Sequence, residues 1–205
     1  MADAVKVLAF DLGGVLLQLG DPLSLFRIDA DAVTFHEKWS RSESVRALER
    51  GAIGIEEFSG RVVEELELPL DAREFRRRFD AWPERLFPGA LETLDRVPAS
   101  YRRVLLSNIN ADHWNRDDIA GALVGRFERL FLSYETGLMK PDADAFRQVI
   151  DFCGCPPAAI LYVDDGPLNV QAAAASGMQA HLARGIADVT RILTRAGVLG
   201  SDQRK

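Results

Sequence analysis

Polar side chains that could do chemistry follow four short apolar runs of the sequence. They are, in chain order, Asp11, the pair Ser107 and Asn108, Lys140, and the pair Asp164 and Asp165. Each has an ordinary structural alternative, such as a turn residue, a surface lysine ahead of a helix, or a helix N-cap. The same pattern after four separate runs is much less probable by coincidence, so we expect one common site.

Three of these side chains are carboxylates, and this fact points to a metal. Asp11, Asp164 and Asp165 would repel one another if the fold brought them together. A cation between them would relieve that repulsion, and hard oxygen ligands suit Mg²⁺. The sequence therefore predicts a magnesium site built on these carboxylates.

The apolar runs themselves predict buried strands, because they are short and end at glycines or polar residues. They span residues 5–10, 103–106, 130–134 and 160–163, with a weaker fifth run at 178–182. Helical patterns lie between them, at 90–97, within 114–130, at 142–152 and at 167–176. This alternation predicts an α/β fold, a Rossmann-like parallel sheet covered by helices on both faces. Ligands of such sheets bind beyond the carboxyl ends of the strands, where the polar residues fall.

The segment 18–87 has a different pattern. Its apolar residues recur with a helical period, as at Phe58, Val62 and Leu66, and no run resembles a strand. We therefore expect a small α-helical domain, residues 18–87, inserted after the first strand. The α/β core would comprise residues 1–17 and 88–200, followed by a frayed tail at 201–205.

Composition excludes several classes of protein. The 205 residues include 25 Lys and Arg against 31 Asp and Glu, a net charge of −6, with no basic stripe for nucleic acid. No stretch has the length of a signal peptide or a membrane span, so we expect no membrane partner and a cytoplasmic location. Cys153 and Cys155 are too close in sequence for a stabilising disulfide, and we expect reduced apolar side chains, with a redox or metal pair as the alternative.

Four motifs resemble those of the haloacid dehalogenase (HAD) superfamily, in the same order and at plausible spacing. They are DLGGV at 11–15, SN at 107–108, GLMKP at 137–141 and VDD at 163–165. The helical insertion resembles that superfamily's α-helical cap. Within the superfamily, the chain most resembles the small bacterial sugar-phosphate phosphatases, including the α-D-glucose-1-phosphatase type. These proteins also have an asparagine and a histidine after the serine-asparagine motif, at the spacing of Asn110 and His113.

The resemblance implies a Mg²⁺-dependent phosphomonoester hydrolase that acts on a small-molecule phosphoester. Asp11 would be the nucleophile that forms an aspartyl-phosphate, and Lys140 would neutralise charge on it and on the phosphoryl group. The Ser107 hydroxyl and the Asn108 backbone N–H would hold the transferring oxygens. The implied metal ligands are Asp11, the Gly13 carbonyl oxygen, Asp165, and Asp164 either directly or through water.

One position departs from the superfamily's pattern. Most of its phosphatases have a second aspartate two residues after the nucleophile as general acid and base, where this chain has Gly13. General acid–base help is typically worth 10²–10⁴-fold. The substrate could be a sugar 1-phosphate, whose hemiacetal leaving oxygen is more acidic than an alcohol. Alternatively, His113 could supply the proton, or the protein could be a poor catalyst.

Two other functions remain open at this stage. In a haloacid dehalogenase, Asp11 would displace halide from carbon, which needs no proton donor and no metal, so Asp164 and Asp165 would be redundant negative charge. A non-catalytic phospholigand-binding protein could also have kept the fold. The retained Asp11, Lys140 and acidic pair argue against that second alternative.

Overall fold

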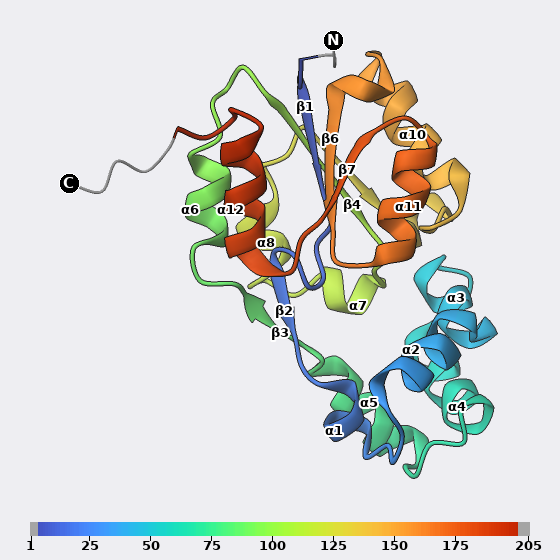
Figure 1. The fold of residues 1–205 in the computed structure, drawn as a ribbon. Coiled ribbons are helices and arrows are strands. Elements are labelled where there is room, and N and C mark those ends of the chain that lie inside the picture. Colours follow the sequence, from blue (N-terminus) through green and yellow to red (C-terminus); the bar gives the residue numbers. More distant parts are fainter. Residues whose placement is uncertain (1–3, 201–205) are drawn as a thin grey trace.

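The computed structural model describes residues 4–200 of the chain, and the tail predicted at 201–205 lies outside them. The described chain forms two parts with separate hydrophobic cores (Figure 1). One is a sheet with helices on both faces, and the other is a group of helices beneath it in that view.

A five-stranded parallel sheet carries the first part. Its strands are β1 (Val7–Phe10), β4 (Arg102–Ser107), β5 (Arg129–Leu132), β6 (Ile160–Asp164) and β7 (Gln179–Leu182), in the order β5-β4-β1-β6-β7. Phe10 of the central strand pairs with Leu105 of β4 and Val163 of β6. This register brings the carboxyl ends of β1, β4 and β6 to one edge, which is the predicted arrangement.

Alternating side chains of β1 enter different cores on the two faces of the sheet. Leu8 and Phe10 pack with α6 (Ala90–Asp95), α12 (Gly185–Arg195), α7 (Ala111–Trp114) and α8 (Ala120–Leu123). Val7 and Ala9 pack with α10 (Ala143–Cys153) and α11 (Pro167–Ala175) on the other face. The short α9 (Ser133–Thr136) follows β5, and a 3-10 turn, η1 (Pro157–Ala159), precedes β6. The predicted α/β fold with helices on both faces is confirmed.

The inserted segment has an aromatic core of its own. Its helices are α1 (Pro22–Phe26), α2 (Ala32–Arg41), α3 (Glu43–Glu49), α4 (Ile55–Glu65) and α5 (Ala72–Asp80). Phe26 stacks on Trp39 with ring centroids 5.9 Å apart, and Phe58 and Phe75 pack 5.8 Å apart edge to face. We call these five helices the cap.

Two short strands within this segment correct the expectation that it holds only helices. β2 (Leu17–Leu19) and β3 (Pro83–Leu86) pair as an antiparallel ribbon between the cap and the sheet (Figure 1). One backbone hydrogen bond, from the Gly20 N–H to the Trp82 carbonyl at 2.9 Å, continues the ribbon. Strands of three and four residues, with polar side chains such as Gln18, are too short to show an alternating pattern.

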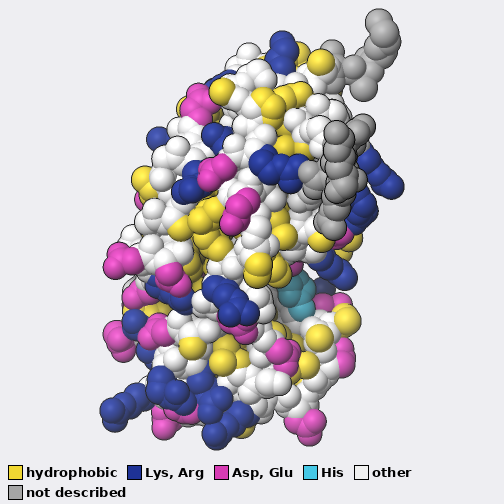
Figure 2. Space-filling model, turned by 90° about the vertical axis from the view of Figure 1, so that its left-hand side faces the viewer, with side chains coloured by type: hydrophobic (Ala, Val, Ile, Leu, Met, Phe, Trp, Pro, Cys, Tyr) yellow, Lys and Arg dark blue, Asp and Glu magenta, His cyan; other side chains and the backbone are white. Residues whose placement is uncertain are grey.

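The surface charges, the lengths of the helices and the two cysteines can be compared with the expectations drawn from composition. Acidic and basic side chains are interspersed over most of the face drawn in Figure 2. None of the described helices is both long and apolar enough to span a bilayer. Cys153 is buried and Cys155 half-buried, and both are free thiols.

Candidate active site

The acidic residues predicted to form a metal site meet at the carboxyl edge of the sheet. Asp11 follows β1, and its backbone N–H bonds to the Val163 carbonyl of β6 at 2.9 Å. Carboxylate oxygens of Asp11, Asp164 and Asp165 all lie within 4.8 Å of one another. Asp11 and Asp164 are buried and Asp165 is half-buried, so their charges are poorly screened by water.

Lys140 lies between two of these carboxylates. Its Nζ donates to Asp11 Oδ1 at 2.6 Å and to Asp164 Oδ2 at 2.7 Å, and its side chain is 2% exposed. The Asn108 side chain holds the Lys140 backbone from both sides, because its Nδ2 donates to the Lys140 carbonyl and its Oδ1 accepts from the Lys140 N–H, each at 2.9 Å. The loop after β4 therefore fixes the lysine that faces the residue after β1.

Asp164 is held by more partners than the sequence suggested. It accepts hydrogen bonds from the Tyr162 hydroxyl, from the Gly166 N–H at 2.7 Å and from Asn169 Nδ2 at 3.0 Å. Tyr162 lies two residues earlier on β6, hence on the same face, and that spacing is a signal we did not use. The contact with Asn169 could not be predicted from the sequence, because it depends on how α11 packs against the end of β6.

The electrostatics of the cluster follow from burial and from its one lysine. Burial raises the pKa of Asp11 to about 8, with Asp164 and Asp165 adding to the effect and Lys140 opposing it. Burial and Asp164 also raise the pKa of Asp165. Burial acts against the charged form of Lys140, but Asp11 and Asp164 outweigh it and raise the pKa of the ammonium. Lys140 and the hydrogen bonds keep the pKa of Asp164 below its ordinary value despite its burial.

The donor set fits a divalent cation. Three carboxylates face one ammonium, so a cation would compensate the excess negative charge, and all the donors are hard oxygens. Both Asp164 oxygens already accept hydrogen bonds, whereas the Asp165 carboxylate accepts none from another described residue. Asp165 and the second oxygen of Asp11 are thus the free donors, and Asp164 suits contact through water.

The glycines after Asp11 let the backbone approach the cluster. A Cβ on Gly14 would lie 2.2 Å from Asp165 Oδ2, and its φ of +69° also favours glycine. The Gly14 N–H bonds to the Leu17 carbonyl at 2.8 Å, which closes the turn between β1 and β2. The role of the Gly13 carbonyl as a ligand stays a prediction.

Ser107 and Asn108 lie at the end of β4, on the same edge as Asp11. Ser107 is buried, and its hydroxyl has no hydrogen-bond partner among the residues that the structure describes. The Asn108 side chain is used on Lys140, which leaves the backbone N–H for the role predicted for it. Phosphate binding by either residue stays a prediction.

The contacts of His113 argue against the acid role that the sequence suggested for it. It is buried, with Nε2 2.8 Å from the Phe79 carbonyl of the cap and Nδ1 3.0 Å from Asn110 Nδ2. Because the carbonyl only accepts and the amide donates, the ring is neutral with its proton on Nε2. Burial lowers the pKa of His113 to about 4. In this conformation the histidine links core and cap and has no free nitrogen.

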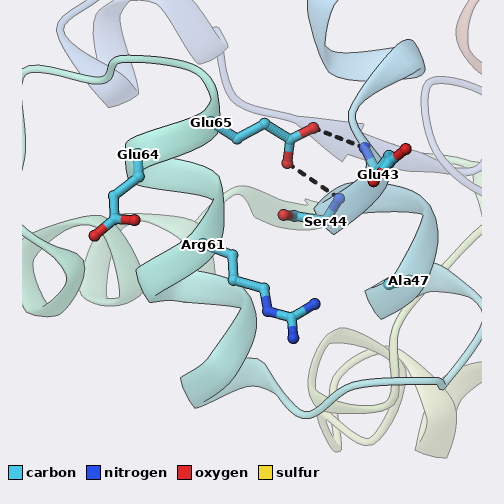
Figure 3. A pocket seen from close by; sticks show the side chains of 6 residues that line it. All are labelled: Glu43, Ser44, Ala47, Arg61, Glu64 and Glu65. Atoms are coloured by element: carbon cyan, nitrogen blue, oxygen red, sulfur yellow. Dashed lines mark hydrogen bonds between the residues drawn. The ribbon is translucent and has the colours of Figure 1, made fainter.

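Two surface depressions lie in the cap and involve none of the acidic cluster. One, of about 620 Å³, is lined by α3 and α4 residues: Glu43, Ser44, Ala47, Arg61, Glu64 and Glu65 (Figure 3). There Glu65 accepts from the backbone N–H groups of Glu43 at 2.7 Å and Ser44 at 3.1 Å, which caps the start of α3. Its contacts are those of a helix cap, so the depression is structural.

The sequence of this chain is similar to known hydrolases. The sequence model of the haloacid dehalogenase-like hydrolases matches residues 5–177. D-ribitol-5-phosphate phosphatase of Bacteroides thetaiotaomicron is 25% identical over 176 residues, 81% of this chain and 85% of the relative.

Two solved structures share the fold. A HAD-like family hydrolase from Porphyromonas gingivalis has a TM-score of 0.71 and 26% identity, covering 93% of this chain and 98% of the other. A HAD family enzyme from Bacteroides thetaiotaomicron, solved in complex with magnesium and inorganic phosphate, has a TM-score of 0.67 and 24% identity over 87% and 94% of the two chains.

The contact between Gly14 and Asp165 generates a prediction about metal affinity. In Gly14→Ala the new methyl group displaces the Asp165 carboxylate, so we expect Mg²⁺ affinity to fall by roughly 10–100-fold, as for other changes that misplace a ligand. Titration calorimetry of folded protein measures it. Gly54→Ala is the matched control, because a Cβ there meets nothing within 4 Å. Wild-type affinity in Gly14→Ala would contradict the assignment of Asp165 as a ligand.

The environment of His113 generates a prediction about acid stability. Its folded pKa of about 4 lies below the ordinary value of 6.5, so the unfolded state binds the proton more readily. The contribution of His113 to the free energy of unfolding is therefore fully present above about pH 6.5. It is lost as the pH falls towards 4, which lowers the free energy of unfolding by about 3 kcal/mol. Urea unfolding at both pH values, compared with His113→Gln, measures it. The same pH dependence in both proteins would refute the buried neutral ring.

Proposed function

Because the chain belongs to the haloacid dehalogenase-like hydrolase family, we propose that it is a Mg²⁺-dependent phosphatase of small phosphomonoesters that acts through an aspartyl-phosphate on Asp11. The observation that carries this proposal is the contact of Lys140 Nζ with Asp11 Oδ1 at 2.6 Å beside Asp164 and Asp165. A nucleophilic carboxylate attacking a phosphate dianion needs such positive charge, and the acidic pair supplies a place for more of it.

The nucleophile is positioned before substrate arrives. Asp11 is fixed by its backbone bond to β6 and by Lys140, so its carboxylate would present one oxygen to phosphorus in line and the other to the metal. Mg²⁺ bound by Asp11, Asp165 and the Gly13 carbonyl, with Asp164 direct or through water, would neutralise charge on the phosphoryl oxygens. The Ser107 hydroxyl and Asn108 N–H would donate to those same oxygens. Phosphoryl transfer consists mostly of such positioning and electrostatics.

The acidic pair favours a phosphatase over a dehalogenase. Displacement of halide needs neither metal nor extra carboxylates, yet Asp164 is held by Lys140, Tyr162 and Asn169 in the buried centre of the site. Burying that charge is costly unless it is used or compensated. In a metal-dependent phosphatase, the buried charge of Asp164 would help to hold the cation.

The substrate class we propose is a sugar phosphate, with a sugar 1-phosphate favoured. Gly13 offers no acid for the leaving oxygen, and a hemiacetal oxygen leaves more readily than an ordinary alcohol. The ribitol-5-phosphate phosphatase relative instead acts on an ordinary alkyl ester. The two alternatives differ in the acidity of the leaving group, which makes them separable by experiment.

The remaining partners and the location follow from the same proposal. The partner is a small-molecule phosphoester, not nucleic acid or membrane. A cytoplasmic location suits two free thiols, Cys153 and Cys155, which reducing compartments preserve.

The first test removes the nucleophile and the metal separately. We expect Asp11→Asn to lower phosphate release on the order of 10³-fold or more, since the isosteric amide cannot attack phosphorus. A chelator should abolish release by wild type, and added Mg²⁺ should restore it. Asp144→Asn changes an exposed aspartate of α10 that pairs with Arg147; this variant is the control and should retain activity. Undiminished release by Asp11→Asn would overturn the mechanism.

The second test compares leaving groups. With sugar 1-phosphates and terminal sugar or sugar-alcohol phosphates at equal concentration, we expect kcat/KM to be higher for the 1-phosphates by about 10-fold or more, because their hemiacetal oxygen is the more acidic leaving group. Phosphate release under Mg²⁺ is the measurement. A preference for the terminal phosphates would reject the leaving-group argument while keeping the phosphatase.

A further inference from the structure

The end of cap helix α3 is fastened directly over the loop that carries Lys140. Arg46 of α3 and Arg50, the residue directly after α3, both bond Asp142 Oδ2, at 3.1 and 2.8 Å. Next to them the Gly51 backbone approaches the Tyr134 carbonyl so closely that a Cβ would lie 2.3 Å from that oxygen. Exposed ion pairs add little stability, but two arginines on one carboxylate and a close backbone contact fix where α3 ends. Figure 1 draws α3 on the side of the cap that faces the core.

Glu49 lies between those two arginines in the sequence, at the last position of α3, and does not share their contact with Asp142. It is half-buried and interacts electrostatically with Lys140 of the site and with Arg46 one turn earlier. Yet the Glu49 carboxylate forms no hydrogen bond or ion pair with any residue that the structure describes. A half-buried carboxyl group beside the catalytic lysine, with no partner of its own, is available to a bound substrate.

We propose that Glu49 is the general acid and base of this site, reaching from the cap to the leaving oxygen in place of the side chain that Gly13 lacks. The inference rests on the proposed phosphatase function and deepens it. His113, the candidate named from the sequence, has both ring nitrogens engaged. His36 of α2 also acts electrostatically on the site, but on Asp165 at the metal side, and it is exposed.

The two steps balance with Glu49 alone as proton carrier. In the first, an Asp11 oxygen bonds to phosphorus and the phosphorus–oxygen bond to the alcohol breaks. Its electron pair stays on the leaving oxygen, which takes the proton of the Glu49 carboxyl. In the second, water bonds to phosphorus and the bond to Asp11 breaks, while the water's proton passes to the Glu49 carboxylate. Phosphate leaves, and Glu49 is protonated again.

Both protonation states of Glu49 are accessible near neutral pH. Burial raises the pKa of its carboxyl to about 7, and the charges of Lys140 and Arg46 hold it from rising further. A group with a pKa near the working pH can both give and take a proton, which is the ordinary requirement for this role. The acid form is lost above that pKa, so the first step on a poor leaving group should slow as the pH rises past about 7.

Glu49→Gln, in the full-length protein with Mg²⁺, tests this inference through the leaving group. On a terminal sugar-alcohol phosphate, we expect single-turnover alcohol release to fall by about 10²–10⁴-fold and to lose its alkaline decline. On p-nitrophenyl phosphate, whose leaving phenolate needs no proton, we expect the burst of p-nitrophenolate to stay within about 3-fold of wild type, with slow turnover afterwards. A sugar 1-phosphate should fall between them.

Glu43→Gln is the matched control, because Glu43 is exposed on the first turn of the same helix. It should behave as wild type on every ester. Circular dichroism and thermal unfolding establish that each variant is folded, and Glu49→Asp, which keeps the carboxyl, should recover part of the lost rate.

The outcomes separate the two proposals. A burst that falls by the same factor as alcohol release would make Glu49 a structural or substrate-binding residue and overturn its role as acid. Unchanged rates on all esters would overturn it as well. If wild type releases no phosphate from any ester with Mg²⁺, the phosphatase proposal itself fails, and the role of Glu49 fails with it.

Discussion

The burial of one lysine between two carboxylates is the constraint on which the rest of the structure depends. Lys140 Nζ lies 2.6 Å from Asp11 and 2.7 Å from Asp164, and none of the three side chains has more than marginal access to water. Such a group is stable only when every charge has a partner. The parallel sheet meets this demand by ending β1 and β6 side by side, and Asn108 at the end of β4 meets it by holding the lysine's backbone.

The same cluster remains short of positive charge. Asp165 adds a third carboxylate, and no second lysine or arginine contacts it among the described residues. A preorganised excess of negative charge attracts a cation at little further reorganisation. Gathering these charges therefore costs folding free energy, and the benefit is a site prepared for a cation.

Sequence patterns located the residues of the site because strand ends in a parallel sheet share one edge. That rule alone predicts that Asp11, Lys140 and the acidic pair meet, although Asp11 is separated from the others by more than a hundred positions along the chain. That rule could not predict the residues that reach the site through the packing of helices and of the cap. His113 looked like a residue at a helix start, and its burial under Phe79 of the cap depends on how two domains meet. Glu49 and the β2–β3 ribbon likewise depend on contacts that no local pattern encodes.

The ribbon also makes the molecule modular. The cap's aromatic core and the two cores of the sheet contain no buried residue in common, and the chain passes between them through β2 and β3. An insertion built in this way can be exchanged or remodelled without repacking the sheet beneath it. Selection can thus alter which molecules are admitted while the acidic cluster at the edge of the sheet is inherited unchanged, and one core can serve enzymes with many different substrates.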